Sequence, residues 1–397
     1  MTKKVKGLFA DKKKVIKISI AVLFFIAFAV FLYFFNQVEK PELVSTNGRT
    51  FETAVVTEIV KDNIQENGSR IGDQYLKLKM LSGDLKGQTV DATSSNGNLF
   101  GAACTVGMRV VTITSVSGDV TVTSVYSQDR QYVIYIFVAI FMLIMCLIGG
   151  KNGLKSVLGL VFTFVCILFL YLPMIFRGFS PFFAAIVVVI LTTFVAMLLI
   201  GGYTKKTFCA ITGTVIGVII SGLAAAIFGY FAGISGYNVS DIESLLFIGQ
   251  STNIDIGGLL FSGILIASLG AVMDVGMSIS STINEIHSNS PNLTRIQLFK
   301  SGINVGRDMM GTMSNTLILA FTGSSLSTLL LDYVYNLPYL QIINSYSIGI
   351  EIMQGLSGTI GVILTVPITS AITAFMITNN KTFSFKKNKV KNDEITE

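Results

Sequence analysis

The feature that most constrains this chain is a series of long apolar runs that begins after Gln131. A helix needs about 20 apolar residues to cross a bilayer. The predicted spans are 132–149, 156–176, 181–201, 208–232, 256–280, 312–332 and 350–377, preceded by an eighth apolar run at 15–35. Because 51% of the residues are hydrophobic and only 13% are charged, we expect an α-helical polytopic membrane protein with about eight transmembrane helices.

Residues 36–130 follow a different pattern. Short segments of alternating apolar and polar residues are separated by turn signals such as Asn67-Gly68 and Ser117-Gly118-Asp119. The predicted strands are 51–60, 74–81, 88–93, 108–116 and 119–127. Five short strands predict a small all-β domain between helices 1 and 2, an OB-like barrel. Acids outnumber basic residues in this segment, which argues against nucleic-acid binding.

The positions of the basic residues predict how the chain is oriented. Lys and Arg gather before the first apolar run, near Lys151, near Lys205, between Arg295 and Arg307, and in the tail. These segments alternate along the chain, so the positive-inside rule places all of them in the cytoplasm. We expect a cytoplasmic N-terminus and anchor helix (1–35), an extracytoplasmic β domain (36–130), a seven-helix membrane domain (131–380) and a charged cytoplasmic tail (381–397).

Two glycine patterns recur in the predicted helices. The tetrapeptide Leu-Ile-Gly-Gly closes a span at 147–150 and again at 199–202. A duplicated hairpin and two unrelated generic hairpins both explain this match. The pairs Gly213/Gly217 and Gly229/Gly233 have helical spacing and predict close helix contacts rather than a phosphate loop.

Three of the predicted spans carry a row of polar or small residues on one helix face. The rows are Asp274, Ser278, Ser281, Glu285; Asp308, Thr312, Asn315, Thr322; and Glu351, Gln354, Gly358, Gly361, Thr365. A carboxylate in the hydrocarbon region costs free energy unless it is neutral, paired or facing water. We therefore expect the three rows to pack together and form a polar interior.

From these rows we predict a substrate or proton path. Its members are Asp274, Ser278, Ser281, Arg307, Asp308, Asn315, Glu351 and Gln354.

Each candidate also has a structural explanation. Asp274 and Arg307 could form an ion pair that locks two helices, and such a pair is compatible with a proton route. Glu351 could stabilise a helix N-terminus, and Asn315 and Gln354 could bond between helices.

The segment around Arg307 and the proline at position 367 predict three further structural features. Arg307-Asp308 could cap a helix start, while residues 294–311 predict an interfacial helix, with a re-entrant segment as the alternative. Pro367 predicts a kink in the last span.

Catalytic and metal chemistry find little support in the sequence. The four cysteines form no Cys-x-x-Cys pattern, and the only histidine is His287, so we expect no metal and no cofactor. The nearest match to the Gly-x-Gly-Asp motif of intramembrane aspartyl proteases is Val305-Gly306-Arg307-Asp308, which lacks the first glycine. An arginine beside the acid would also discourage proton sharing between two carboxylates. We therefore expect that the protein is not an enzyme.

Three stretches resemble the YibE/F-like family of bacterial multi-pass membrane proteins. They are LGAVMDVGMSISSTINEI, LFKSGINVGRDMMGTMSNTLILAFTGSSL and EIMQGLSGTIGVILTVPIT. The resemblance implies a polytopic fold in the bacterial plasma membrane and carries over no catalytic residue.

Two functions remain compatible with these features. The first is a transporter or permease, with proton coupling as an option, whose polar path is lined by helices 6–8 and accepts an unknown small solute or ion. The alternative is a non-transporting scaffold or sensor whose β domain binds a protein or envelope partner. The other expected partner is the lipid bilayer, nucleic acid is not expected, and an oligomer is left open.

Overall fold

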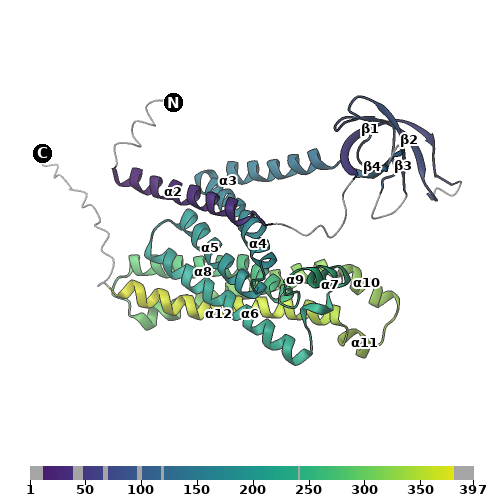
Figure 1. The fold of residues 1–397 in the computed structure, drawn as a ribbon. Helices are drawn as coiled ribbons and strands as arrows, with labels where there is room; N and C mark the ends of the chain where they lie inside the picture. Colours follow the sequence, from purple (N-terminus) through teal and green to yellow (C-terminus); the bar gives the residue numbers. More distant parts are fainter. Residues whose placement is uncertain are drawn as a thin grey trace. The chain divides into compact units, whose positions relative to one another are not determined.

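The computed structural model describes residues 12–38, 48–65, 70–95, 101–117, 120–239 and 242–379. The chain divides into two compact units, one of Pro41–Ile148 and one of Met1–Lys40 with Gly149–Glu397. Figure 1 labels the elements of both units. The turns predicted at Asn67-Gly68 and Gly118-Asp119, the first eleven residues and the tail from residue 381 lie outside the described residues.

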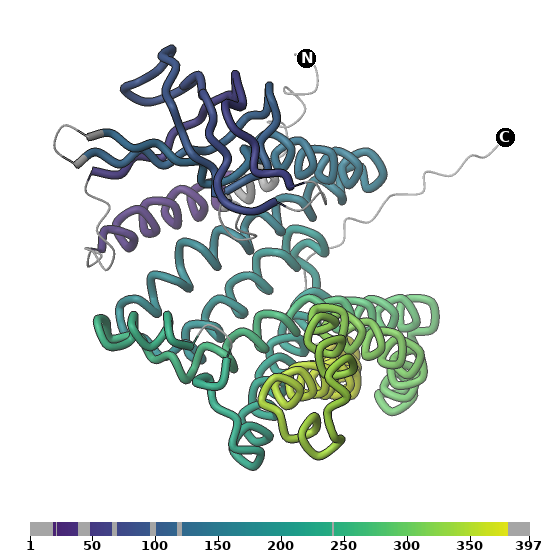
Figure 2. The backbone as a smooth tube through the Cα atoms, turned by 90° about the vertical axis from the view of Figure 1, so that its right-hand side faces the viewer, coloured from purple at the N-terminus to yellow at the C-terminus, as the bar shows by residue number. Residues whose placement is uncertain are grey.

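The smaller unit contains a closed five-stranded barrel. Its strands are β1 (Arg49–Lys61), β2 (Gln74–Met80), β3 (Thr89–Ser94), β4 (Arg109–Ser117) and β5 (Val120–Gln128). They follow the order β1-β2-β3-β5-β4 around the barrel, and only the β3–β5 pair is parallel. Figure 2 shows these strands curling around a common centre. All five predicted strands are confirmed, with ends that differ by at most two residues.

The barrel core follows from the alternation of side chains along each strand. On β2 the residues Leu76, Leu78 and Met80 are buried while the residues between them face outward or lie half-buried. Gln74 begins this strand, and its amide donates to Asp62 Oδ1 at 2.9 Å while its oxygen accepts from the Cys104 backbone N–H at 2.8 Å. The Gln74 bond is the main cause that holds the pKa of the exposed Asp62 carboxyl below its ordinary value.

One glycine interrupts the first long helical run, and another ends the second. The first run comprises α3 (Gln131–Cys166), a π-helical turn (Ile167–Tyr171) and α4 (Leu172–Phe176), and Gly150 interrupts α3 with φ 54°. The second run is α5 (Pro181–Gly201), and Gly202 follows it with φ 68°. These are the last glycines of the two Leu-Ile-Gly-Gly tetrapeptides, and glycine adopts a positive φ without steric cost. Both tetrapeptides therefore close a helical segment, as predicted.

Several helices have the length and composition of membrane spans. Within the described residues, five stretches qualify, and a bent pair of helices described below makes a sixth when it is counted as one span. The stretch 131–176 counts once here although Gly150 divides it, and Val22–Phe35 in α2 (Lys12–Phe35) is a shorter apolar helix. The chain thus has the helices of a membrane protein, while the total of about eight spans stays a prediction.

Small residues bring three long helices together at the centre of the larger unit. These helices are α6 (Lys205–Ala232), α8 (Leu259–Asn289) and α12 (Tyr346–Thr378), which lie side by side in Figure 1. A Cβ atom built on Gly361 of α12 would lie 2.9 Å from the Gly217 carbonyl oxygen of α6. The contact predicted at Gly213 and Gly217 is confirmed, because both face hydroxyl-bearing residues of α12.

The second predicted glycine pair behaves differently. Gly229 faces the Phe261 ring of α8, which confirms a close contact. Gly233 instead ends α6 in a left-handed conformation, and a Cβ there would meet nothing within 4 Å. Gly233 is therefore a C-terminal cap rather than a packing residue, so this half of the prediction is wrong.

The segment after residue 294 forms one long helix, which corrects two expectations. Helix α9 runs continuously over Arg295–Ser324, so 294–311 is not a separate interfacial or re-entrant helix and Arg307-Asp308 caps no helix start. The actual start has a capping box, in which Thr294 and Gln297 bond to each other's backbone N–H groups. The helix ends at Ser324, and α10 (Leu326–Val334) follows after Ser325 at a bend of 61°.

The remaining elements are short. They are a 3-10 turn (Gly236–Asn238), α7 (Ile242–Ser251) and α11 (Tyr339–Ile343). Helix α12 continues through Pro367 in a single helical stretch.

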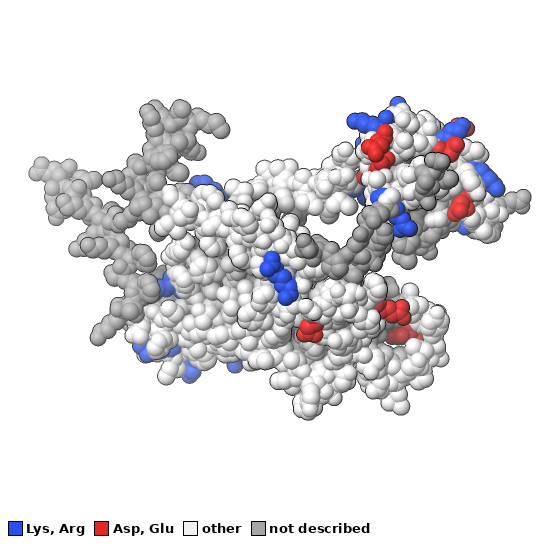
Figure 3. Space-filling view, viewed as in Figure 1, with Lys and Arg blue, Asp and Glu red and all other residues white. Residues whose placement is uncertain are grey.

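Charge is sparse on the surface of the larger unit. In the view of Figure 3 most of its visible basic side chains lie toward one end, whereas its acids lie toward the end that carries α7 and α10. On this face the acids and the bases thus gather at different ends, although exposed Glu285 and Asp308 also lie near basic residues of α8 and α9.

The contact between α6 and α12 can be tested at Gly217. A Cβ there would meet Thr365 Oγ1 and lie 3.0 Å from Val272 Cγ1, so Gly217→Ala should destabilise the protein by about 1–3 kcal/mol. Gly263→Ala is the matched control, because nothing lies within 4 Å of its Cβ position and alanine suits a helix better. Thermal unfolding in detergent measures the difference, and equal melting temperatures for the two variants would contradict the packing described here.

Candidate functional site

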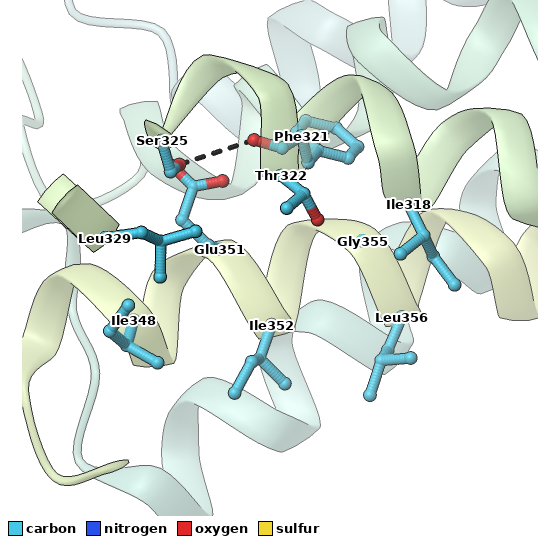
Figure 4. Close-up of a pocket in the computed structure, with 10 residues that line it drawn as sticks. All are labelled: Ile318, Phe321, Thr322, Ser325, Leu329, Ile348, Glu351, Ile352, Gly355 and Leu356. Carbon is cyan, nitrogen blue, oxygen red and sulfur yellow. Dashed lines mark hydrogen bonds between the residues drawn. The ribbon is translucent and has the colours of Figure 1, made fainter. Parts of the chain in front are cut away.

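A pocket with a volume of about 280 Å³ lies between α9, α10 and α12. Figure 4 shows its lining, in which α12 forms one side and the junction of α9 with α10 forms the other. The residues that line it are Ile318, Phe321, Thr322, Ser325, Leu329, Ile348, Glu351, Ile352, Gly355 and Leu356. The pocket is therefore mostly apolar, with two hydroxyl groups and one carboxyl group.

Glu351 is the ionisable residue of this lining. Its Oε2 atom is buried and has no hydrogen-bond partner among the described residues. Helix α12 begins at Tyr346 with Ser345 as its N-cap, so Glu351 lies beyond the first turn. The stabilisation of acids by a helix N-terminus fades beyond that turn. The hypothesis that Glu351 stabilises the N-terminus of its helix is therefore wrong.

The bend between α9 and α10 shapes the other side of the pocket. Ser325 is the hinge residue, and its backbone N–H donates to the Thr322 carbonyl at 3.2 Å. The Ser325 hydroxyl donates to the Phe321 carbonyl at 3.3 Å, as drawn in Figure 4. These bonds partly satisfy the carbonyl groups that a helix leaves free at its C-terminus. Broken helices at membrane depth are a recurrent feature of transporter binding sites.

On α8 the structure leaves the Asp274 face open. Asp274 lies near the middle of this 31-residue helix and is exposed, while Ser278 and Ser281 are half-buried. A Cβ built on Gly263 or Gly270 would meet nothing within 4 Å. Those glycines and Asp274 are exposed at helical spacing, so they form one uncovered row of small and polar residues.

The suggested ion pair between Asp274 and Arg307 is not formed. Among the described residues the ion pairs are all in the barrel, and neither side chain has a partner. The two helices do pack against each other, because Gly302 and Gly306 of α9 contact Ile283 and Ile279 of α8. This antiparallel register places Asp274 about level with Gly311, one turn beyond Arg307.

On α9 the predicted path residues form a continuous exposed row. Arg307, Asp308 and Asn315 are all exposed, and two turns further along the helix the row reaches Thr322. Thr322 lines the pocket that holds Glu351. The α9 row therefore leads from the level of Arg307 to the pocket.

The third predicted row, on α12, meets the α9 row only at Glu351, which shares the pocket with Thr322. Gln354 is half-buried, and Gly358, Gly361 and Thr365 are buried. Gly361 and Thr365 face α6, and Gly358 faces Leu317 and Ser268. The expectation that all three rows meet in one polar interior is wrong, because the small residues of α12 are used for helix packing.

Sequence reasoning missed a group of buried hydroxyls in the helical core. Six of them, on α6 and α12, have no hydrogen-bond partner among the described residues: Thr214, Ser221, Thr359, Thr369, Ser370 and Thr373. The four-residue spacing of Thr365, Thr369 and Thr373 opposite Gly213 and Gly217 was the available signal. No group of three or more His, Cys, Asp or Glu suited to a metal occurs in the described part of the chain.

Comparison with protein families assigns the helical part of the chain. The family model described as YibE/F-like protein matches residues 137–379, which is more than half of the sequence. The chain belongs to the YibE/F-like family. The match covers α8, α9 and α12, and so contains every predicted path residue of this YibE/F-like protein. The comparisons with curated proteins and with solved structures returned no match.

The unpaired carboxyl oxygen of Glu351 predicts an effect on stability. An unsatisfied buried polar group costs about 1–3 kcal/mol, so Glu351→Leu should raise the free energy of unfolding by about 1 kcal/mol. The control is Glu243→Gln, because Glu243 on α7 is exposed and its replacement should change little. Chemical or thermal unfolding in detergent compares the variants, and a destabilised Glu351→Leu protein would show that the carboxylate has a partner.

Proposed function

We propose that this YibE/F-like protein is a membrane transporter or permease for a small solute or ion, and that it is not an enzyme. The proposed path follows the exposed rows of α8 and α9 and ends at the pocket of Glu351. Its residues are Asp274, Ser278, Ser281, Arg307, Asp308, Asn315, Glu351 and Gln354.

The observation that carries this proposal is the uncovered row of Asp274. The carboxylate lies in the middle of an apolar helix long enough to span a bilayer, on a face that no other described element covers. An ionised acid facing hydrocarbon costs about 2.5 kcal/mol or more, and Arg307, Asp308 and Asn315 add to that cost. Water along this face removes the penalty, and a water-lined route is what a transporter needs.

Proton coupling is the second part of the proposal. Asp274 and Glu351 are carboxyl groups without ion-pair partners in the described structure, so protonation would break no salt bridge. Their charge could change with the side of the membrane that they face, which is how acids in transporters relay protons. The proposed location is the bacterial plasma membrane, with both termini in the cytoplasm and the barrel outside.

Water access along the path can be tested without knowing the substrate. In a background without the native cysteines, Gly270→Cys and Gly311→Cys should react with a membrane-impermeant maleimide, because both positions have room for a side chain. Ile190→Cys is the control, since Ile190 is an exposed apolar residue in the middle of α5 and should stay unreactive. Equal protection of all three thiols would mean that lipid or protein covers the proposed path.

Transport itself requires a flux measurement. Metabolite and ion profiles of cells with and without the protein should differ, and Asp274→Asn at normal expression should abolish the difference. A variant that keeps every measured flux would exclude this mechanism.

A scaffold or sensor is the second candidate function, and a groove on the barrel favours it. We propose that the barrel is OB-like, because its single parallel pair joins β3 to β5. A groove of about 450 Å³ crosses β2, β3 and β5, and exposed Tyr75 and Val122 line it together with Lys77. Lys77 donates a hydrogen bond to Glu58 at 2.8 Å and Asp91 also lines the groove, so the charges are balanced and the groove suits a polar partner. OB-folds use the same face of strands 2 and 3 to bind ligands.

Removal of the barrel separates the two candidates. A chain without residues 41–128 should keep its flux if the helical unit transports alone. Loss of the cellular phenotype with unchanged flux would favour the scaffold or sensor.

A further inference from the structure

We propose that the pocket between α9, α10 and α12 binds a small hydrophobic organic cation, such as a substituted ammonium ion. This inference names the substrate class of the proposed transporter and rests on that function. Three features of the pocket carry it: the sign of its charge, the chemistry of its walls and the unpaired state of Glu351.

The charge of the pocket is negative. Glu351 is the charged residue of the lining, and no Lys, Arg or His lines the pocket. The C-terminal end of α9 and the N-terminal end of α10 meet at Ser325. Their partial charges have opposite signs, so they oppose each other and the carboxylate decides the sign. An anionic ligand would meet repulsion here, whereas a cation would supply the partner that Glu351 Oε2 lacks.

The walls exclude a bare metal ion as the preferred ligand. Calcium takes six to eight oxygen ligands and magnesium prefers a complete octahedron. The pocket offers one carboxylate and the hydroxyls of Thr322 and Ser325, and the Ser325 hydroxyl already donates to Phe321. The other walls are aliphatic or aromatic, and they match the apolar substituents of an organic cation rather than the water shell of an ion.

The volume of the pocket and its aromatic wall further restrict which ligands it can bind. A volume of about 280 Å³ lies near the lower end of the usual range for small-molecule pockets. Phe321 belongs to the wall, and aromatic faces attract quaternary ammonium groups. A lipid chain would also fill an apolar pocket, but it would leave the carboxylate unpaired. A compact cation with one apolar group therefore fits both the apolar wall and the unpaired carboxylate.

Equilibrium binding to the full-length protein in nanodiscs tests the proposal. The probe is radiolabelled benzyltrimethylammonium, and the competitor is neopentylbenzene, which has the same shape without the charge. We expect saturable binding of the cation that the neutral compound does not displace. Glu351→Gln should weaken binding by about tenfold or more, and Glu351→Asp should restore part of it. Glu243→Gln is the control acid outside the pocket and should bind as the unmodified protein does.

A second variant keeps the test valid if Glu351→Gln misfolds. Gly355 lines the pocket, and the nearest atom to its Cβ position is Ile318 Cγ1 at 3.9 Å. Gly355→Val should therefore fold and occupy part of the cavity, which would weaken binding without a change of charge. Absence of saturable binding, or equal binding of the neutral compound with no effect of Glu351→Gln, would overturn the proposal.

Uptake into proteoliposomes separates this inference from the proposed function. Saturable binding without uptake of any tested solute would retain the cation site and reject the transporter. Uptake of another solute without binding of benzyltrimethylammonium would retain the transporter and reject the cation site.

Discussion

The close approach of α6 and α12 is the contact on which the larger unit depends. Gly213 and Gly217 on one helix meet Gly361, Thr365 and Thr369 on the other, at distances that leave no room for a larger side chain on the glycines. Membrane helices gain little from hydrophobic burial against each other, because lipid is equally apolar, so short-range packing has to hold them together. The contact also explains why the small residues of α12 do not line a polar interior.

The same packing leaves the charged positions of α8 and α9 on the outside. Helix α9 contacts α8 and α12 through Gly302, Gly306 and Leu317. Asp308 and Asn315 lie on its opposite face and are exposed. Helix α8 likewise buries its apolar face and exposes Asp274. A bundle whose outer face is charged at mid-span needs water or another polar surface there. The proposed route and the pocket of Glu351 are two parts of this one polar face.

The larger unit and the barrel each have their own candidate binding site, a pocket at the broken helix and a groove on the barrel. The bend at Ser325 lies at the cavity, which Leu329 of α10 lines together with Thr322 and Glu351. The barrel is stabilised by its own core around Leu76 and Leu78. Its groove at Tyr75 therefore does not depend on the core of the larger unit. A ligand inside the bundle and a partner on the barrel are therefore independent possibilities, and each has its own residues.

The sequence by itself determined which elements exist. Alternation of apolar residues predicted the five strands, and uninterrupted apolar runs predicted helices such as α5, whose bounds match residue for residue, because periodicity and length are local properties. It also predicted the Gly213 and Gly217 contact and the family. It placed Glu351 among the candidate residues, but not in a pocket. Only the tertiary structure decided that α12 packs on α6, that Asp274 and Arg307 stay unpaired, and that the bend at Ser325 lies at the cavity. Those outcomes depend on side chains far apart in the chain, whose packing decides which face of each helix is covered.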